Sequence, residues 1–187
     1  MFHALDGSQM ETRPWVTFFS QTGSEIVQIS EALGRWPDMI ISNRRPADAR
    51  IISPLIPKDR LYFTSNKPEA YEYLHYLRQV ENPVVTLHGW LRIIPEEVCD
   101  KYEMYNGHPG LITRYPELKG KDPQMRAFQG DYNTGGCVIH KVTPGVDEGE
   151  ILMEREIGIR LLDLDGLFRT LHKTSVNMWI EFLKERL

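Results

Sequence analysis

Short apolar runs alternate along the chain with stretches in which hydrophobic residues recur every three or four positions. The apolar runs are typical of buried strands and fall at residues 15–19, 38–43, 60–64, 83–87, 103–106, 136–142 and 150–159. Helical spacing is found at residues 26–33, 68–80, 95–101, 124–129 and 163–185. This alternation predicts an α/β fold, with a Rossmann-like, mostly parallel sheet covered by helices on both faces. We expect one domain over residues 15–187, preceded by a polar leader over residues 1–14.

Composition narrows the classes of protein that fit this pattern. The chain has 187 residues, of which 41% are hydrophobic, and this is enough for one domain with its own core. Its formal net charge of −4 gives no general attraction to nucleic acid or to an anionic membrane, so we expect neither as a partner. Cys99 and Cys137 are too few for a disulfide scaffold and lack metal-site spacing. We therefore expect a cytoplasmic protein without a bound metal.

The segment Asn106-Gly107-His108-Pro109-Gly110 follows a predicted strand. Alternate residues of an extended segment point the same way, so the side chains of Asn106 and His108 should project side by side. An amide donor beside an imidazole can stabilise an oxyanion and move a proton. An Asn-Gly turn with a surface histidine explains the same residues, and taken alone this plainer interpretation is favoured.

Two further polar segments lie where predicted strands end. Residues 20–24, Ser-Gln-Thr-Gly-Ser, connect a strand to a helix, where backbone N–H groups can bind an anion with the help of the helix dipole. A turn with a serine cap explains this loop equally well. Residues 136–150 run from a strand into a Pro-Gly loop, in which Asp147 can orient a histidine and raise its pKa. An ordinary surface loop is the plainer explanation of this segment.

Taken together, these segments resemble the folate-dependent formyltransferase family. The pattern consists of Asn106-x-His108-Pro109, a Gly-Cys-x-x-His-x-Val strand about 30 residues later, and a loop that ends Val-Asp-x-Gly at Asp147. The likeness begins near Val16 and is most specific between residues 85 and 151. By pattern it is closest to the branch that formylates phosphoribosylglycinamide (GAR), which would place the protein in purine biosynthesis.

The resemblance implies that Asn106, His108 and Asp147 occupy the family's catalytic positions. It also implies 10-formyltetrahydrofolate as the formyl donor and a small-molecule primary amine as the acceptor. Negative charge grows on the formyl oxygen as the amine attacks, and Asn106 and a protonated His108 can donate hydrogen bonds to that oxygen. Asp147 would favour the imidazolium and hold a water that relays the amine proton toward N10 of the departing folate.

The resemblance further implies where the two substrates bind. The pterin ring of the folate is expected among Leu91, Arg92, Ile93, Ile94, Val142, Thr143 and Asp147. In the GAR enzymes a similar first loop holds the substrate phosphate, and the matching residues here are Ser20, Thr22, Gly23 and Ser24. We therefore expect a phosphorylated amine as the acceptor, with GAR as the first candidate.

Two residues depart from the GAR pattern and leave the acceptor open. A glutamate that contacts the ribose in GAR enzymes is Leu171 here, and an apolar side chain cannot accept hydrogen bonds from a diol. The asparagine that follows Gly-Ser in the phosphate loop is Glu25 here, whose charge would repel a phosphate if the side chain pointed inward. An amino-sugar nucleotide, a hydroxyornithine-like amine and water stay open as acceptors. A catalytically silent folate-binding module is the alternative outside the enzymes.

Overall fold

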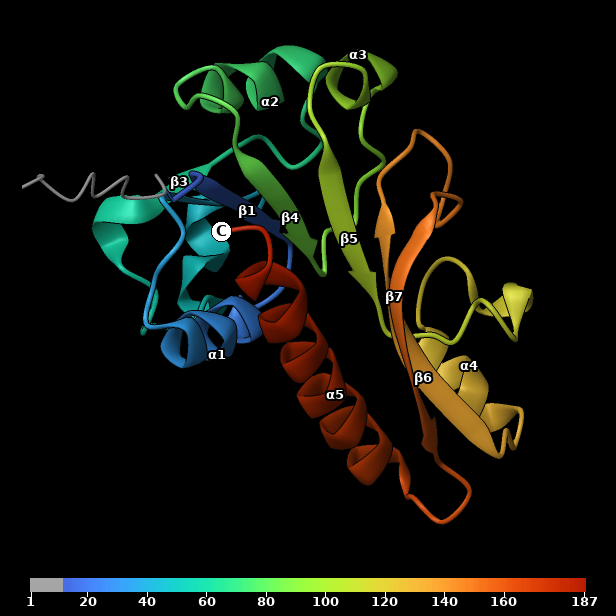
Figure 1. Cartoon of the computed structure of the whole chain (residues 1–187). Helices are drawn as coiled ribbons and strands as arrows, with labels where there is room; N and C mark the ends of the chain where they lie inside the picture. The colour runs from blue at the N-terminus through green and yellow to red at the C-terminus, as the bar shows by residue number, and fades with distance from the viewer. Residues whose placement is uncertain (1–11) are drawn as a thin grey trace, which may run out of the picture.

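A seven-stranded sheet lies at the centre of the computed structural model, which describes residues 12–187 (Figure 1). Its strands are β1 (Trp15–Phe19), β2 (Met39–Ser42), β3 (Leu61–Phe63), β4 (Val84–His88), β5 (Met104–His108), β6 (Thr134–Lys141) and β7 (Ile151–Gly158). They lie in the order β3-β2-β1-β4-β5-β6-β7. The first five are parallel, whereas β6 pairs antiparallel with β5 and β7, so the predicted mostly parallel sheet is confirmed. Of the predicted leader over residues 1–14, residues 1–11 lie outside the described part.

Five α-helices occur within residues 12–187. They are α1 (Ser24–Leu33), α2 (Ala70–Leu77), α3 (Glu96–Cys99), α4 (Pro123–Gln129) and α5 (Leu164–Lys184). Gly23 and Gly34 flank α1 with positive φ angles, which glycine adopts without strain. Asp163 caps α5 by accepting a hydrogen bond from the Gly166 N–H at 2.7 Å. The periodicity did not predict the short 3-10 helices at Pro46–Ile51, Lys58–Arg60 and Pro116–Leu118, because pieces this short carry no repeating pattern.

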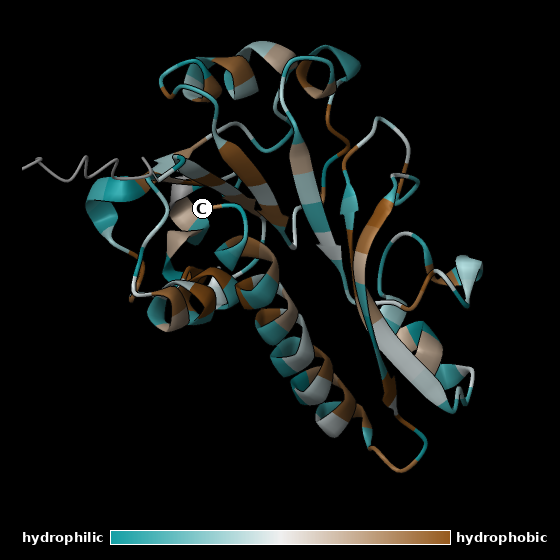
Figure 2. Cartoon of the chain, in the orientation of Figure 1, coloured by the Kyte–Doolittle hydropathy of each residue, from teal (hydrophilic) through white to brown (hydrophobic). Residues whose placement is uncertain are grey.

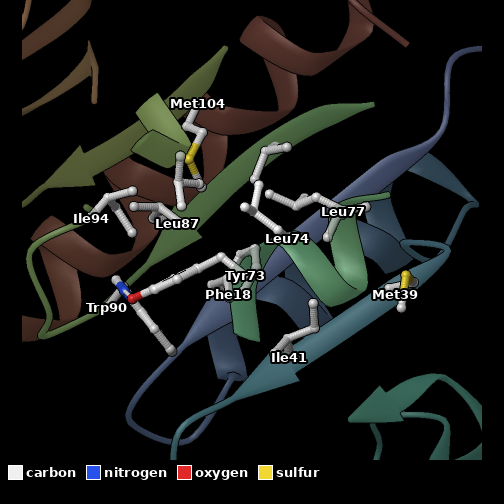
Figure 3. Packing of buried hydrophobic residues seen from close by; sticks show 13 residues of the cluster. Phe18, Met39, Ile41, Tyr73, Leu74, Leu77, Leu87, Trp90, Ile94 and Met104 are labelled. Atoms are coloured by element: carbon white, nitrogen blue, oxygen red, sulfur yellow. Dashed lines mark hydrogen bonds between the residues drawn. The ribbon is translucent and has the colours of Figure 1, made fainter. Parts of the chain in front are cut away.

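Alternate residues of the central strands pack on opposite faces of the sheet. Phe18 of β1 faces α2. Its ring centre lies 5.5 Å from that of Tyr73 in α2 and 5.4 Å from that of Trp90, which follows β4 (Figure 3). The Trp90 indole N–H donates to the Tyr73 hydroxyl at 3.2 Å, so the polar groups of both side chains are paired inside the core. Burial of a side chain of this class is worth about 1.5–3 kcal/mol, and the packing anchors the segment that follows β4.

The opposite face of the sheet is covered by α1 and α5, which pack against each other (Figure 1). Trp15 of β1 lies there with Trp179 and Phe182 of α5, all three fully buried. In Figure 2, α5 carries both hydrophobic and hydrophilic residues around its turns, as a helix with one buried face does. No helix within residues 12–187 is long and apolar enough to cross a membrane.

Candidate active site

A cleft of about 830 Å³ opens at the carboxyl ends of β1, β4 and β5, which is where ligands bind in open parallel sheets. Most residues predicted for the site line this cleft. They are Thr22, Gly23, Ser24, Leu91, Arg92, Ile93, Ile94, Asn106, His108, Val142, Thr143 and Asp147. Ser20 does not line the cleft. It is buried, and its hydroxyl accepts a hydrogen bond from the Leu91 N–H at 3.0 Å, so it ties the first loop to the end of β4.

Asn106, His108 and Asp147 lie together at the cleft, and His140 joins them. Asn106 and His108 are alternate residues at the end of β5 and therefore face the same way. Asp147 Oδ2 lies 3.3 Å from His108 Nδ1, and Asp147 Oδ1 lies 3.2 Å from His140 Nε2. His140 Nε2 in turn lies 3.2 Å from the amide nitrogen of Asn106. Two segments, residues 106–108 and residues 140–147, which are distant along the chain, thus form one connected polar cluster.

Both ring nitrogens of His108 face groups of the protein. Nε2–H donates to the Leu118 carbonyl at 2.8 Å, and Nδ1 faces Asp147. Burial of the ring lowers the pKa of His108 below its usual 6.5, by more than the neighbouring Asp147 raises it. The expected effect of Asp147, a raised pKa, is present, but burial of the ring outweighs it, and that burial could not be read from the sequence. Burial thus disfavours the charged ring, whereas the Leu118 carbonyl and the Asp147 carboxylate, which face its two nitrogens, favour it.

Asp147 is presented by the loop that joins β6 to β7. Its φ angle is 51°, a left-handed conformation that few residues other than glycine adopt. Its Oδ2 accepts a hydrogen bond from the Gly120 N–H at 2.8 Å. Burial raises the pKa of Asp147, but hydrogen bonding and the charges of His108 and His140 lower it by more, to below its usual 3.8. An ionised carboxylate between two imidazoles is suited to stabilise either ring when it takes up a proton.

His140 belongs to the cluster, although sequence reasoning did not assign it to the site. Its Nδ1–H donates to the Lys141 carbonyl at 2.7 Å, and its Nε2 lies 3.2 Å from both the amide nitrogen of Asn106 and Oδ1 of Asp147. The Asn106 amide carries two hydrogens, so at least one stays available to a ligand. His140 does stand in the strand motif that precedes Asp147, but its place opposite Asn106 comes from the antiparallel pairing of β5 with β6, which no sequence pattern shows.

Gly107 lines the cleft and lies against Trp179, which leaves no room for a side chain at this position. A Cβ at Gly107 would lie 2.6 Å from the indole nitrogen of Trp179. The Trp179 ring centre lies 4.6 Å from that of His88, another residue that lines the cleft. Because successive residues of a strand point to opposite faces, the cleft passes around the strand ends from the side of Asn106 to the side of α5.

One end of the cleft, which we call the apolar end, carries exposed aliphatic side chains. Leu91 is 50% exposed, Ile93 is 61% exposed and Val146 is 46% exposed, and all three line the cleft. Exposed apolar side chains gathered in a concave site are typical of ligand-binding pockets. The Arg92 guanidinium donates to the Asn66 carbonyl at 2.8 Å, which holds the segment that carries Leu91 and Ile93.

The other end, which we call the Glu25 end, lies between α1 and α5. It is lined by residues 22–24 and by the buried Leu171 of α5. The side chain of Glu25 turns inward, so that Oε1 lies 2.7 Å from His88 Nδ1 and Oε2 accepts a hydrogen bond from the Ser175 hydroxyl at 2.9 Å. The loop predicted to hold a phosphate is therefore followed by a carboxylate that faces the cleft.

The described residues offer neither a metal centre nor a reactive thiol. No group of three or more His, Cys, Asp or Glu side chains in residues 12–187 is arranged to hold a metal ion. Cys137 is fully buried, and burial raises the pKa of its thiol to about 12. Burial also raises the pKa of Cys99. Neither sulfur is therefore a thiolate at neutral pH, and the chemistry of the cleft depends on its amide, imidazole and carboxylate groups.

Known proteins of similar sequence are formyltransferases. Residues 20–181 match the model of the formyl transferase family. A methionyl-tRNA formyltransferase from Thermotoga sp. (strain RQ2) is 30% identical over 156 residues, which are 80% of this chain and 48% of that protein. A phosphoribosylglycinamide formyltransferase from Bacillus subtilis (strain 168) is 26% identical over 132 residues, 65% of this chain and 66% of that protein. The chain thus spans less than half the length of the first of these relatives.

A solved structure agrees in fold. The crystal structure of phosphoribosylglycinamide formyltransferase from Bacillus halodurans matches with a TM-score of 0.78 at 20% identity, and the match covers 92% of this chain and 94% of that one. The family match extends from the end of β1 into α5 and includes every strand end and loop that builds the cleft. This chain belongs to the formyl transferase family.

Proposed function

We propose that this protein transfers a formyl group from 10-formyltetrahydrofolate to a primary amine. The observation that carries the proposal is the connected cluster of Asn106, His108 and Asp147 beside a cleft with an exposed apolar end. Membership of the formyl transferase family supports the same chemistry. Transfer of this kind needs a hydrogen-bond donor to the formyl oxygen and a group that accepts and releases one proton. It needs no covalent enzyme intermediate.

The apolar end fits the pterin ring of the folate. Leu91, Ile93 and Val146 present exposed aliphatic surface that the flat faces of the ring would cover, and Ile94 and Val142 line the same part of the cleft. The folate supplies the formyl carbon, and its N10 receives a proton when the C–N10 bond breaks. Burial of a ring system against these side chains would supply binding energy without contact with the reacting atoms.

We assign to Asn106 the role of hydrogen-bond donor to the formyl oxygen. Its amide nitrogen lies 3.2 Å from His140 Nε2 and carries two hydrogens, so at least one is left to stabilise the negative charge that grows on that oxygen. One oriented donor of this kind is typically worth about two to three powers of ten in rate. His140 acts through Asn106 as a positioning residue, because its own Nδ1 is fixed on the Lys141 carbonyl.

We propose for His108 a role that differs from the one the resemblance implies. Burial lowers its pKa and so favours the neutral ring, which can act as a base, whereas the resemblance implies a protonated donor. We assign it the amine proton, which reaches Nδ1 through the carboxylate of Asp147 as the new N–C bond forms. Asp147 stabilises the resulting imidazolium, and the proton then passes to N10 of the folate as the old C–N10 bond breaks.

The direct test is incubation of the purified protein with 10-formyltetrahydrofolate and a panel of amines. The panel contains GAR, an amino-sugar nucleotide, hydroxyornithine and methionyl-tRNA, the last because named relatives act on it. We expect one amine to be formylated with release of tetrahydrofolate. The Asn106→Ala variant should lose about 100- to 1,000-fold in kcat/KM while its melting temperature stays unchanged.

Two results would contradict the proposal. Release of formate without any formylated amine would assign hydrolysis, with water as the acceptor. Tight binding of 5-formyltetrahydrofolate without turnover of any amine would assign a silent folate-binding module. Loss of the wild-type rate in Asn106→Ala separates true turnover from a contaminating activity, because a contaminant is unaffected by the substitution.

A further inference from the structure

The Glu25 end of the cleft holds a carboxylate that the transfer chemistry does not use. Glu25 lies in the first turn of α1, and its side chain, 20% exposed, borders the cleft. Its oxygens contact His88 Nδ1 at 2.7 Å and the Ser175 hydroxyl at 2.9 Å. Within the described part of the chain, His88 is the only basic side chain at ion-pair distance from it. The net charge of the Glu25–His88 pair therefore depends on whether His88 is protonated.

Hydrogen-bond directions indicate that His88 is neutral. The indole N–H of Trp15 can only donate, and it donates to the Thr86 hydroxyl at 2.9 Å. The same hydroxyl lies 2.8 Å from His88 Nε2. Thr86 is fully buried, and among residues 12–187 its hydroxyl proton has no bonded acceptor other than that Nε2. Nδ1 then carries the one proton of the ring and donates it to Glu25.

Glu25 is consequently an anion that no lysine or arginine within residues 12–187 approaches to ion-pair distance. Burial raises its pKa, but the contacts with His88 and Ser175 and the proximity of His172 lower it by more, to below its usual 4.5. The dipole of α1 also stabilises a negative charge in its first turn. A helix N-terminus can stabilise a bound phosphate, but at α1 the carboxylate of Glu25 already provides the negative charge that interacts with the helix dipole.

We propose that Glu25 determines acceptor specificity, so that the amine carries no phosphate and presents a hydrogen-bond donor or a positive charge to this carboxylate. The proposal rests on the proposed formyl transfer to an amine. A phosphate on residues 22–24 would lie beside a like charge, which at close range costs an order of magnitude or more in affinity. The carboxylate oxygens keep lone pairs for a donor on the ligand. Leu171, which lines the same end, offers no acceptor to a ribose diol.

The test compares two sugars that carry groups of opposite charge at C5. Ribose 5-phosphate carries the anion, and 5-amino-5-deoxyribose carries an ammonium group in its place. Dissociation constants are measured by calorimetry for the wild type, Glu25→Gln and the control Glu31→Gln. Glutamine keeps the shape of Glu25 and can still accept from His88. Glu31 is exposed on the same helix, so its variant changes the net charge equally but away from the cleft.

We expect the wild type and Glu31→Gln to prefer the amino sugar, and Glu25→Gln to gain at least tenfold in affinity for ribose 5-phosphate. An unchanged ratio of the two dissociation constants overturns the proposal, and so does a Glu25→Gln protein that melts like the wild type but gains no affinity for the phosphate. Glu25→Asn is measured in parallel as a second neutral variant. Binding of 5-formyltetrahydrofolate is measured separately, because its absence contradicts formyl transfer and leaves the charge comparison valid.

Discussion

Asp147 connects the two histidines of the cleft, with one carboxylate oxygen 3.3 Å from His108 Nδ1 and the other 3.2 Å from His140 Nε2. Asp147→Asn keeps the shape and removes the charge that would stabilise a protonated His108. We expect kcat/KM to fall by about two to three powers of ten. Steady-state kinetics check the rate, and titration with 5-formyltetrahydrofolate checks that the donor still binds. A rate within about threefold of the wild type would show that His108 needs no counter-charge.

The lowered pKa of His108 predicts how the rate depends on pH. A base must be deprotonated to accept the amine proton, so kcat/KM should fall on the acid side, with a midpoint below 6.5. A pH–rate profile between about pH 5 and about pH 8 measures this midpoint. The same profile for His108→Gln should be slow and should lack the acid limb. A requirement for the protonated ring would instead restore the donor role that the family resemblance suggested.

At the scale of elements, hydrophobic period located the helices and strands but not their directions. The strand predicted at residues 83–87 is β4 (Val84–His88), and the helix predicted at 163–185 is α5 (Leu164–Lys184). The apolar runs of β6 and β7 do not distinguish parallel from antiparallel pairing, because a buried strand has the same pattern either way.

Local hydrophobic spacing also does not predict the long-range contacts of His140 and Glu25 in the cleft. Asn106 and His108 are two residues apart, and their common orientation follows from strand geometry alone. His140 is 34 residues from its partner Asn106, and Glu25 is 150 residues from Ser175. Contacts of this range depend on strand order and on helix packing, and neither can be read from local spacing. The inward position of Glu25 therefore had to come from the structure.

The loop between β6 and β7 is expected to be intolerant of added volume at Gly149. A Cβ there would lie 1.6 Å from the Lys141 carbonyl oxygen, so the backbone that carries Asp147 must shift. We expect Gly149→Ala to lower the free energy of unfolding by about 1–3 kcal/mol and to weaken folate binding. Denaturant titration and calorimetry measure the two effects.

Gly158→Ala is the matched control for this substitution. Gly158 ends β7, and a Cβ there would have no atom within 4 Å. Its free energy of unfolding should stay within about 0.5 kcal/mol of the wild type. Equal effects of the two substitutions would mean that the 142–149 loop can move away from β6 without cost.

At the scale of the whole molecule, the cleft uses both faces of one sheet edge. Asn106 and His108 project from β5 on the face covered by α2, whereas His88 projects from β4 toward Trp179 of α5. The apolar end and the Glu25 end are therefore built by different layers and meet at the ends of the central strands. Under the proposed function, this arrangement would allow the folate site to be kept while residues on α1 and α5, such as Glu25 and Leu171, determine the acceptor.

Acid should destabilise the molecule through the same buried groups. Folding lowers the pKa of His108, Glu25 and Asp147 from their usual 6.5, 4.5 and 3.8. A group with a lowered pKa binds fewer protons in the folded than in the unfolded protein, so its stabilisation is complete above the unfolded-state pKa and disappears as the pH falls through the folded-state pKa. We expect the melting temperature to begin falling near pH 6.5 and to fall most steeply below 4.5.

Comparison with Glu25→Gln isolates one of these contributions. The variant lacks the charge that accepts hydrogen bonds from His88 and Ser175, and such bonds are worth about 1.5–3 kcal/mol. At neutral pH the wild type should exceed the variant in free energy of unfolding by an amount of this order, and the difference should shrink as the pH falls below 4.5. Glu31→Gln should show no such convergence, because its side chain is exposed. A difference that instead grows as the pH falls toward 4.5 would mean that Glu25 is already protonated in the folded protein at neutral pH, and an uncharged Glu25 could not exclude a phosphate from the acceptor end.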